Sequence, residues 1–189
     1  MPPTIRTFIA LELPPSVISL LEKVQEDLKS MGLQAKWVRP ENIHLTLKFL
    51  GNINPGDIDK IGGAMMDAVE DFAAINLVAG GVGVFPGIRR PRVIWIGLGG
   101  QIQLLFGMQR VLEDNLAALG FKKEKRPFKG HLTMGRFRQT VKSNMIRQIM
   151  REYANRYSEE FTARRILLFK SDLKPTGAVY SQLQQAVLE

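Results

Sequence analysis

The chain has 189 residues, of which 45% are hydrophobic and 23% charged, and its formal net charge is +8. It contains no cysteine, which excludes disulfides, thiolate metal sites and cysteine nucleophiles and is typical of the reducing cytoplasm. No segment is long and apolar enough to span a membrane, and the N-terminus lacks the apolar core and cleavage site of a signal peptide. We therefore expect a soluble cytoplasmic protein that folds as one domain over residues 1–189.

Apolar residues at helical spacing predict four helices, and alternating or β-branched segments predict the strands between them. In chain order, we expect a strand over 4–13, a helix over 15–31, a strand over 43–50, a helix from 54 to about 72, strands over 75–84 and 92–98, a helix over 102–119, a strand over 131–137, a helix over 143–157, and strands over 160–172 and 178–188. Gly32 and Gly120 end two of the helices, and residues 174–177 read as a turn.

The order of these elements repeats approximately along the chain, and no linker, charge block or low-complexity segment separates the two halves. Strands and helices mixed in this way indicate an α+β fold. We predict two pseudo-symmetric lobes, whose antiparallel sheets line a central cleft and whose helices pack outside.

Both histidines of the chain belong to the same short motif. His44-Leu45-Thr46 follows Arg39-Pro40, and His131-Leu132-Thr133 follows Arg126-Pro127 at the same spacing. Residues i and i+2 of a strand point to one face, so each motif presents an imidazole beside a hydroxyl. Two copies that face each other across a pseudo-twofold axis would surround one substrate atom with two acid–base groups and two hydroxyl donors.

This arrangement suits chemistry at a phosphorus atom. Histidine takes and gives protons near neutral pH, so one imidazole can activate water while the other protonates the departing oxygen. Thr46 and Thr133 would donate hydrogen bonds to the non-bridging phosphate oxygens. Two separate histidines without nearby carboxylates make a poor metal site, so we expect no metal and no other cofactor. As the alternative, each of the four side chains is an ordinary strand residue.

The positive charge is concentrated in the second half of the chain. Residues 1–95 contain 10 Lys and Arg against 10 Asp and Glu, whereas residues 96–189 contain 16 against 8. The densest run, Lys122-Lys123-Glu124-Lys125-Arg126, lies just before the second motif. Such an asymmetry favours a surface that binds a polyanion such as nucleic acid, although a solvated basic face would have the same composition.

The motifs and their surroundings resemble the RNA 2′,3′-cyclic phosphodiesterases, also called 2′-5′ RNA ligases, of the two-histidine phosphoesterase superfamily. The resemblance covers nearly the whole chain and is carried by residues 8–14, 37–51, 91–95, 126–136 and 174–180. It implies metal-independent opening of a 2′,3′-cyclic phosphate at an RNA 3′ end, which leaves a 2′-phosphate. We expect a monomer without a membrane partner, and tRNA fragments are one candidate substrate.

The resemblance also implies roles for individual residues. His44 and His131 correspond to the acid–base pair, and Thr46 and Thr133 correspond to the phosphate-binding residues. Since water attacks and the 3′-oxygen leaves, we assign His44 as the general acid to that oxygen and His131 as the general base for water.

Two further residues match family positions near the substrate. Arg136 corresponds to an arginine close to the phosphate and the terminal base, and Phe49 to a position that can stack on that base. A solvent-facing arginine and a core phenylalanine are the respective alternatives. The chain departs from the family at Lys129-Gly130, where Pro-His or His-Pro is common, and at Gly135, where Ala is common. We expect Gly130 to loosen the approach to His131.

Three other functions stay open. The same step run backwards, with an RNA hydroxyl in place of water, gives an ATP-independent 2′-5′ RNA ligase. The substrate could instead be a small cyclic nucleotide, although the net charge favours an RNA with several phosphates. A non-catalytic RNA-binding module would keep the basic face but would not need a titrating pair. A serine hydrolase is disfavoured because no Gly-x-Ser-x-Gly segment exists.

Overall fold

The computed structural model describes residues 3–175 and 177–189, so Thr176 in the predicted turn lies outside the described residues. The elements in chain order are β1 (Ile5–Leu11), α1 (Pro15–Ser30), β2 (Lys36–Trp37), η1 (Pro40–Asn42), β3 (Leu45–Ile53), η2 (Pro55–Asp57), α2 (Ile58–Val69), β4 (Ile75–Phe85), β5 (Val93–Gly100), α3 (Ile102–Ala118), β6 (His131–Arg136), α4 (Ser143–Glu152), β7 (Phe161–Ala163), β8 (Arg165–Lys174) and β9 (Gly177–Val187). None of the helices in this part of the chain is long and apolar enough to cross a membrane.

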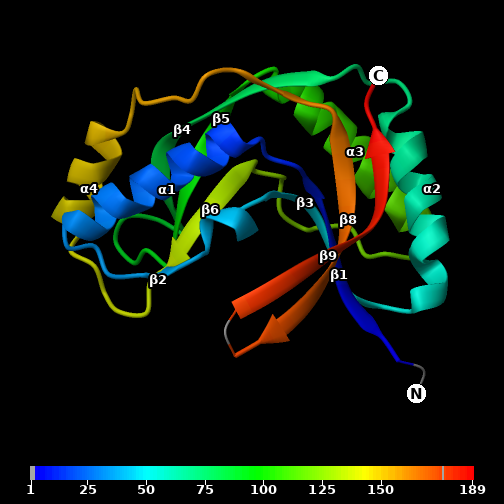
Figure 1. The fold of residues 1–189 in the computed structure, drawn as a ribbon, viewed down its shortest axis with the longest axis horizontal. Helices are drawn as coiled ribbons and strands as arrows, with labels where there is room; N and C mark the ends of the chain where they lie inside the picture. The colour runs from blue at the N-terminus through cyan, green and yellow to red at the C-terminus, as the bar shows by residue number, and fades with distance from the viewer. Residues whose placement is uncertain (1–2, 176) are drawn as a thin grey trace.

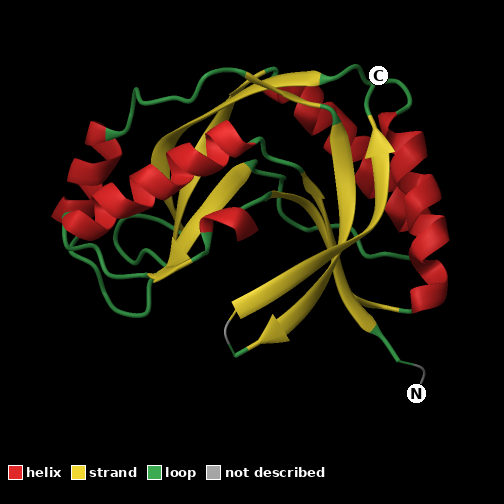
Figure 2. Ribbon diagram, in the orientation of Figure 1, coloured by secondary structure: helices red, strands yellow, loops and turns green. Residues whose placement is uncertain are grey.

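The strands form two antiparallel sheets, which confirms the predicted α+β class. The first sheet has the order β3-β1-β8-β9 and the second the order β2-β6-β5-β4-β7. Helices α2 and α3 pack on the first sheet, and α1 and α4 pack on the second (Figure 1). Figure 2 shows these two helix pairs at opposite ends of the molecule, with most of the strands between them. We call the two groups the first and the second lobe.

The lobes do not correspond to the two halves of the sequence. The first sheet combines β1 and β3 with β8 and β9 from the C-terminal end. Helix α1 follows β1 but packs on the second sheet, where Gln25 donates a hydrogen bond to the carbonyl of Met134 at 3.0 Å. Helix α3 follows β5 but packs on the first sheet, where Gln109 donates to the carbonyl of Leu47 at 3.2 Å. This exchange of helices ties the lobes together.

The core is continuous across both lobes because each helix buries one apolar stripe. In α1 the buried side chains include Val17, Leu21, Val24 and Leu28, at spacings of three and four residues, which is the spacing of one helical face. Side chains from all four helices and both sheets join one hydrophobic cluster. Each fully buried aliphatic side chain contributes about 1.5–3 kcal/mol to the stability of the fold. The shared core therefore stabilises the arrangement of the two sheets.

Two predicted elements differ from the observed ones. The strand expected over 160–172 is divided into β7, which pairs with β4, and β8, which pairs with β1, because the chain changes sheets between them. The helix expected over 143–157 ends at Glu152. The following residues instead run beside β4, where Tyr157 forms a bridge with Gly80.

Candidate active site

The two His-Leu-Thr motifs lie on strands that approach each other between the lobes. His131 begins β6, and His44 immediately precedes β3. β3 and β6 are in contact, and a Cβ added to Gly130 would lie 3.8 Å from Cδ1 of Leu45. The residues that flank the two histidines are therefore neighbours in space. A central cleft with both histidines on its walls stays a prediction.

Gly130 lies where side chains from both lobes come close to its backbone. An added Cβ would lie 3.3 Å from Cδ1 of Leu98, which is tighter than usual packing, and 3.7 Å from Cδ2 of Leu105, which is an ordinary contact. The expectation that Gly130 loosens the approach to His131 stays a prediction.

The two imidazole rings are held in the same way. Nδ1 of His44 lies 2.8 Å from the carbonyl oxygen of Asn42, and Nδ1 of His131 lies 2.7 Å from that of Lys129. A carbonyl oxygen only accepts hydrogen bonds, so each Nδ1 carries a proton and donates it. Nε2 is then the ring atom of each histidine that can exchange a proton with a substrate.

Each motif strand contains one extra residue directly after its threonine. In the β1–β3 pair, Ala10 lies opposite Thr46 but Ile9 lies opposite Lys48, so Leu47 is the inserted residue. In the β5–β6 pair, Trp95 lies opposite Thr133 but Ile94 lies opposite Gly135. Both strands therefore have a β-bulge at the same position of the motif.

The bulges decide which side chains accompany the histidines. Without them, a residue five positions after a histidine would point to the opposite face of the strand. One inserted residue moves every later side chain of the strand to the other face. As a result, Phe49 pairs with Phe8 and Arg136 pairs with Val93. Phe49 is 42% exposed and Arg136 is also exposed. The structure thus brings Phe49 to the face of His44 and Thr46, and Arg136 to the face of Thr133.

His44 is enclosed by aromatic side chains of the first sheet. Its ring stacks on Phe8 with centroids 4.5 Å apart and meets the edge of Tyr180 at 5.3 Å. This burial lowers the pKa of His44, and the hydrogen bond to the carbonyl of Asn42 opposes the effect. The free protein therefore favours the neutral form of His44. His44 and Tyr180 also border a cavity of about 540 Å³.

His131 is supported by aromatic edges of the second sheet. The ring centroid of Phe85 lies 5.0 Å from that of the imidazole at an interplanar angle of 88°, and that of Trp95 lies 6.2 Å away at 62°. Trp95 lies over Gly83, since an added Cβ there would come within 2.2 Å of the indole. Gly83 is therefore required for Trp95 to support His131.

Arginines from both lobes act on Tyr180. Burial raises the pKa of Tyr180, and the positive charges of Arg6 and Arg136 oppose that rise. Arg136 belongs to the second sheet and Tyr180 to the first, so its charge reaches across the lobes. The guanidinium of Arg6 also lies 4.5 Å from the centre of the Phe49 ring. Sequence reasoning did not single out Arg6, Phe8 or Tyr180, because only the folded sheet brings them to His44 and Phe49.

The part of the chain that the structure describes holds no cluster of three or more His, Cys, Asp or Glu side chains suited to bind a metal ion.

Of the residues expected at the site, all six lie on β3, on β6 or directly before β3. They are His44, Thr46, Phe49, His131, Thr133 and Arg136.

A family model described as LigT like Phosphoesterase matches residues 11–95 and again residues 97–180. Each match contains one His-Leu-Thr motif, as expected for a duplicated unit. The chain belongs to the LigT-like phosphoesterase family. The family predicted from the sequence is thereby confirmed.

Relatives of known name span almost the whole chain. A protein of Archaeoglobus fulgidus named RNA 2′,3′-cyclic phosphodiesterase is 32% identical over 179 residues, which cover 95% of this chain and 98% of the relative. A protein of Methanothermobacter thermautotrophicus with the same name is 29% identical over 180 residues and covers 95% and 97%.

Solved structures share the fold. A crystal structure from Thermus thermophilus has a TM-score of 0.76 at 25% identity and covers 97% of this chain and 98% of its own. The structure of E. coli LigT complexed with 3′-AMP has a TM-score of 0.74 at 19% identity, with 98% and 99% covered. The predicted two-sheet α+β architecture therefore agrees with solved relatives.

Proposed function

We propose that this chain hydrolyses the 2′,3′-cyclic phosphate at the 3′ end of an RNA to a 2′-phosphate, without a metal ion. The observation that carries the proposal is the matched pair of imidazoles, each fixed through Nδ1 with Nε2 left for proton transfer. The names of the relatives support the choice of substrate. Both lobes contribute residues, so the proposal treats residues 1–189 as one catalytic domain.

In the proposed step, Nε2 of His131 takes a proton from water as the water oxygen attacks phosphorus. The bond between phosphorus and the 3′-oxygen breaks, and protonated His44 gives its Nε2 proton to that oxygen. The products are a 2′-phosphate and a 3′-hydroxyl. Afterwards His44 is neutral and His131 is protonated, and exchange of one proton with solvent restores the starting state.

The lowered pKa of His44 has a consequence for this assignment. A general acid must be protonated when the substrate is bound, whereas burial favours neutral His44 in the free protein. A phosphate anion beside the ring would raise the pKa again, because an opposite charge favours the imidazolium. Substrate binding would therefore favour the protonated form of His44 that a general acid requires.

The remaining site residues bind the substrate in this proposal. Thr46 and Thr133 donate hydrogen bonds to the non-bridging oxygens, where charge is held in the transition state. Arg136 contacts the phosphate and the terminal base, since a guanidinium suits both. Phe49 stacks on that base with the ring face that Arg6 leaves open. One copy of the chain supplies all six residues, so a monomer suffices, and tRNA fragments with cyclic ends are candidate substrates.

The test is incubation of the protein with a short RNA that ends in a 2′,3′-cyclic phosphate, in excess chelator, followed by mass spectrometry and 2′/3′ product analysis. We expect a 2′-phosphate from the wild type and a loss of about 10²- to 10⁴-fold in His44→Ala and His131→Ala. A 3′-phosphate would overturn the assigned leaving group. RNA binding without turnover would indicate a binding module instead, and activity abolished by the chelator would refute metal independence.

A further inference from the structure

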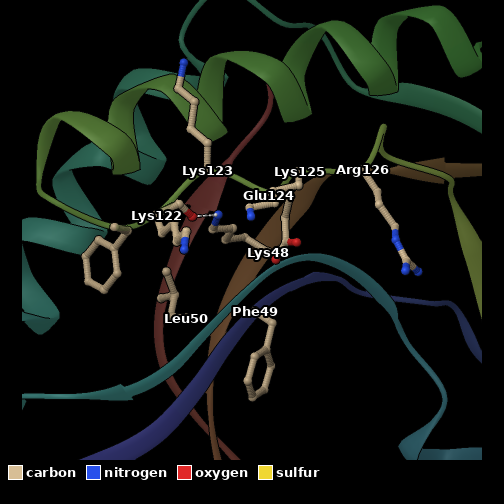
Figure 3. Close-up of a pocket in the computed structure, with 9 residues that line it drawn as sticks. Lys48, Phe49, Leu50, Lys122, Lys123, Glu124, Lys125 and Arg126 are labelled. Carbon is tan, nitrogen blue, oxygen red and sulfur yellow. Dashed lines mark hydrogen bonds between the residues drawn. The ribbon is translucent and has the colours of Figure 1, made fainter.

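A second cavity, of about 490 Å³, lies between the edge strand β3 and the loop that leads to β6 (Figure 3). Its lining comes from Lys48, Phe49 and Leu50 on the strand and from residues 121–126 on the loop. The strand continues directly to Thr46 and His44, and the loop continues to His131. The cavity therefore adjoins both motifs without containing either histidine.

A buried ion pair fixes the loop against the strand. Nζ of Lys48 lies 2.6 Å from Oε1 of Glu113 on α3, and the two side chains are only 3% and 12% exposed. Lys48 also donates to the carbonyl of Lys122 at 2.7 Å, and the amide of Glu124 donates to Glu113 at 2.6 Å. Figure 3 shows Lys48 and Phe49 on opposite sides of the strand. Lys48 is thus a positioning residue whose charge is already neutralised.

The exposed cations of the loop are not neutralised in this way. Lys122, Lys125 and Arg126 are exposed, and none of them forms an ion pair with a described residue. Lys123 pairs with Asp114 on α3. Glu124 is the one acidic residue in the lining. The cavity therefore presents an excess of positive charge held on a fixed backbone.

The cavity beside His44 lacks this excess of positive charge. Its lining includes Glu41 and Glu12 and no lysine or arginine, and Glu12 is paired with Arg165 at 2.8 Å. Phosphate groups would find no cation in that lining and would be attracted to the loop of residues 121–126 instead. The charges of the two cavities thus give a direction in which an RNA strand can leave the candidate active site.

We infer that the groove formed by Lys122, Lys125 and Arg126 along β3 binds the phosphates of the RNA upstream of its terminal nucleotide. This inference rests on the proposed function and names the path of its substrate. Arg126 stands five residues before His131, a reach of at most about 18 Å for an extended chain. The groove is therefore close enough to hold a strand whose last phosphate lies between the histidines.

The test compares a 2′,3′-cyclic mononucleotide with a ten-nucleotide RNA that ends in the same cyclic phosphate. In Lys122→Ala/Lys125→Ala, we expect the kcat/KM ratio of RNA to mononucleotide to fall about tenfold, mainly through the KM for RNA. Lys23→Ala/Arg147→Ala is the charge-matched control, since it removes two exposed cations from α1 and α4. The control should keep the wild-type ratio.

Binding of a fluorescent RNA that ends in a 2′-phosphate gives a readout that does not need turnover. The slope of log K against log salt should become shallower by about 1.4 in Lys122→Ala/Lys125→Ala, because each phosphate contact to a single strand contributes about 0.7. If the kcat/KM ratio and the salt slope were unchanged, or if the control variant changed them equally, the groove would not bind the phosphates of the RNA. Failure of the wild type on both substrates would instead count against the proposed function.

Discussion

The two His-Leu-Thr motifs have the same backbone geometry in different surroundings. In both, Nδ1 donates to the carbonyl two residues earlier, and a bulge follows the threonine. His44 stacks on Phe8 and is buried enough for its pKa to fall, whereas His131 meets Phe85 and Trp95 only edge-on. The comparison teaches that equivalent backbone geometry can hold two imidazoles in different packing, and that the packing of His44 lowers its pKa.

The fourth residue after each histidine shows how the lobes differ at their edges. Gly135 on β6 is covered by β2, and an added Cβ would lie 3.1 Å from Cε3 of Trp37. Lys48 on β3 pairs with Ile9 of β1 on one side only, because β3 is the last strand of its sheet. Its side chain instead contacts α3 and the loop of residues 121–126. The second lobe thus closes its edge with a strand, and the first lobe closes it with a basic loop.

Removal of each histidine in turn tests whether the two motifs contribute equally to the reaction. We expect His44→Ala and His131→Ala to lower kcat about equally, by about 10²- to 10⁴-fold, because each removes one of the two groups that transfer a proton in the proposed step. The thermal midpoint should fall more for His44→Ala, since only His44 stacks face to face on a buried ring. If either variant kept a tenth of the wild-type kcat, the histidine it replaces would not transfer a proton in the reaction.

The next largest effect concerns the edge of β3. Lys48→Met leaves Glu113 buried without its partner, which should cost about 3–5 kcal/mol of unfolding free energy. Urea denaturation would measure this cost. Lys48→Met/Glu113→Leu removes both charges and should recover most of the loss. If the single variant were no less stable than the exposed control Lys23→Met, the ion pair would not hold the loop.

A smaller effect is expected at the threonines. Thr46→Val and Thr133→Val each remove one hydrogen-bond donor to the phosphate, and a loss of about 10²-fold in kcat is expected. Thr46→Ser and Thr133→Ser keep the hydroxyl and should restore most of the activity. Valine variants that match the serine variants would show that the hydroxyls do not serve the reaction.

The sequence predicts the placement of the candidate site residues where its pattern is local. The repeat around His44 and His131 and the i, i+2 rule are enough to place Thr46 and Thr133 on the faces of their histidines. The same rule fails for Phe49 and Arg136, because a bulge depends on the register with a neighbouring strand that is distant in sequence. No residue type at Leu47 or Met134 marks the insertion.

The fold shows the same limit at a larger scale. Hydrophobic spacing locates the four helices, but it does not say which sheet each one covers. Gln25 and Gln109 reveal the exchange of α1 and α3 only through their bonds to distant carbonyls. Likewise, Tyr180 reaches His44 because β9 joins the sheet of β1 through β8, a pairing that local patterns do not specify.

The difference in packing between the two histidines should also be visible as a pH effect. Burial lowers the pKa of His44 from the ordinary value of 6.5, so NMR titration of the free protein should give His44 a pKa below that value. Addition of inorganic phosphate should raise it, if an anion binds beside the ring. A pKa of His44 at or above 6.5 in the free protein would contradict the burial argument.

The same shift links folding stability to pH. Between the lowered pKa of folded His44 and the ordinary value of 6.5, the unfolded chain binds more protons than the folded one, so stability rises with pH through this window. As pH falls below about 6.5, this contribution is lost until the folded pKa is passed. The urea midpoint of the wild type should therefore drop on acidification more than that of His44→Gln, which has no group to titrate there. Equal drops in the two proteins would mean that other groups control the acid sensitivity and that His44 is not held neutral by its packing.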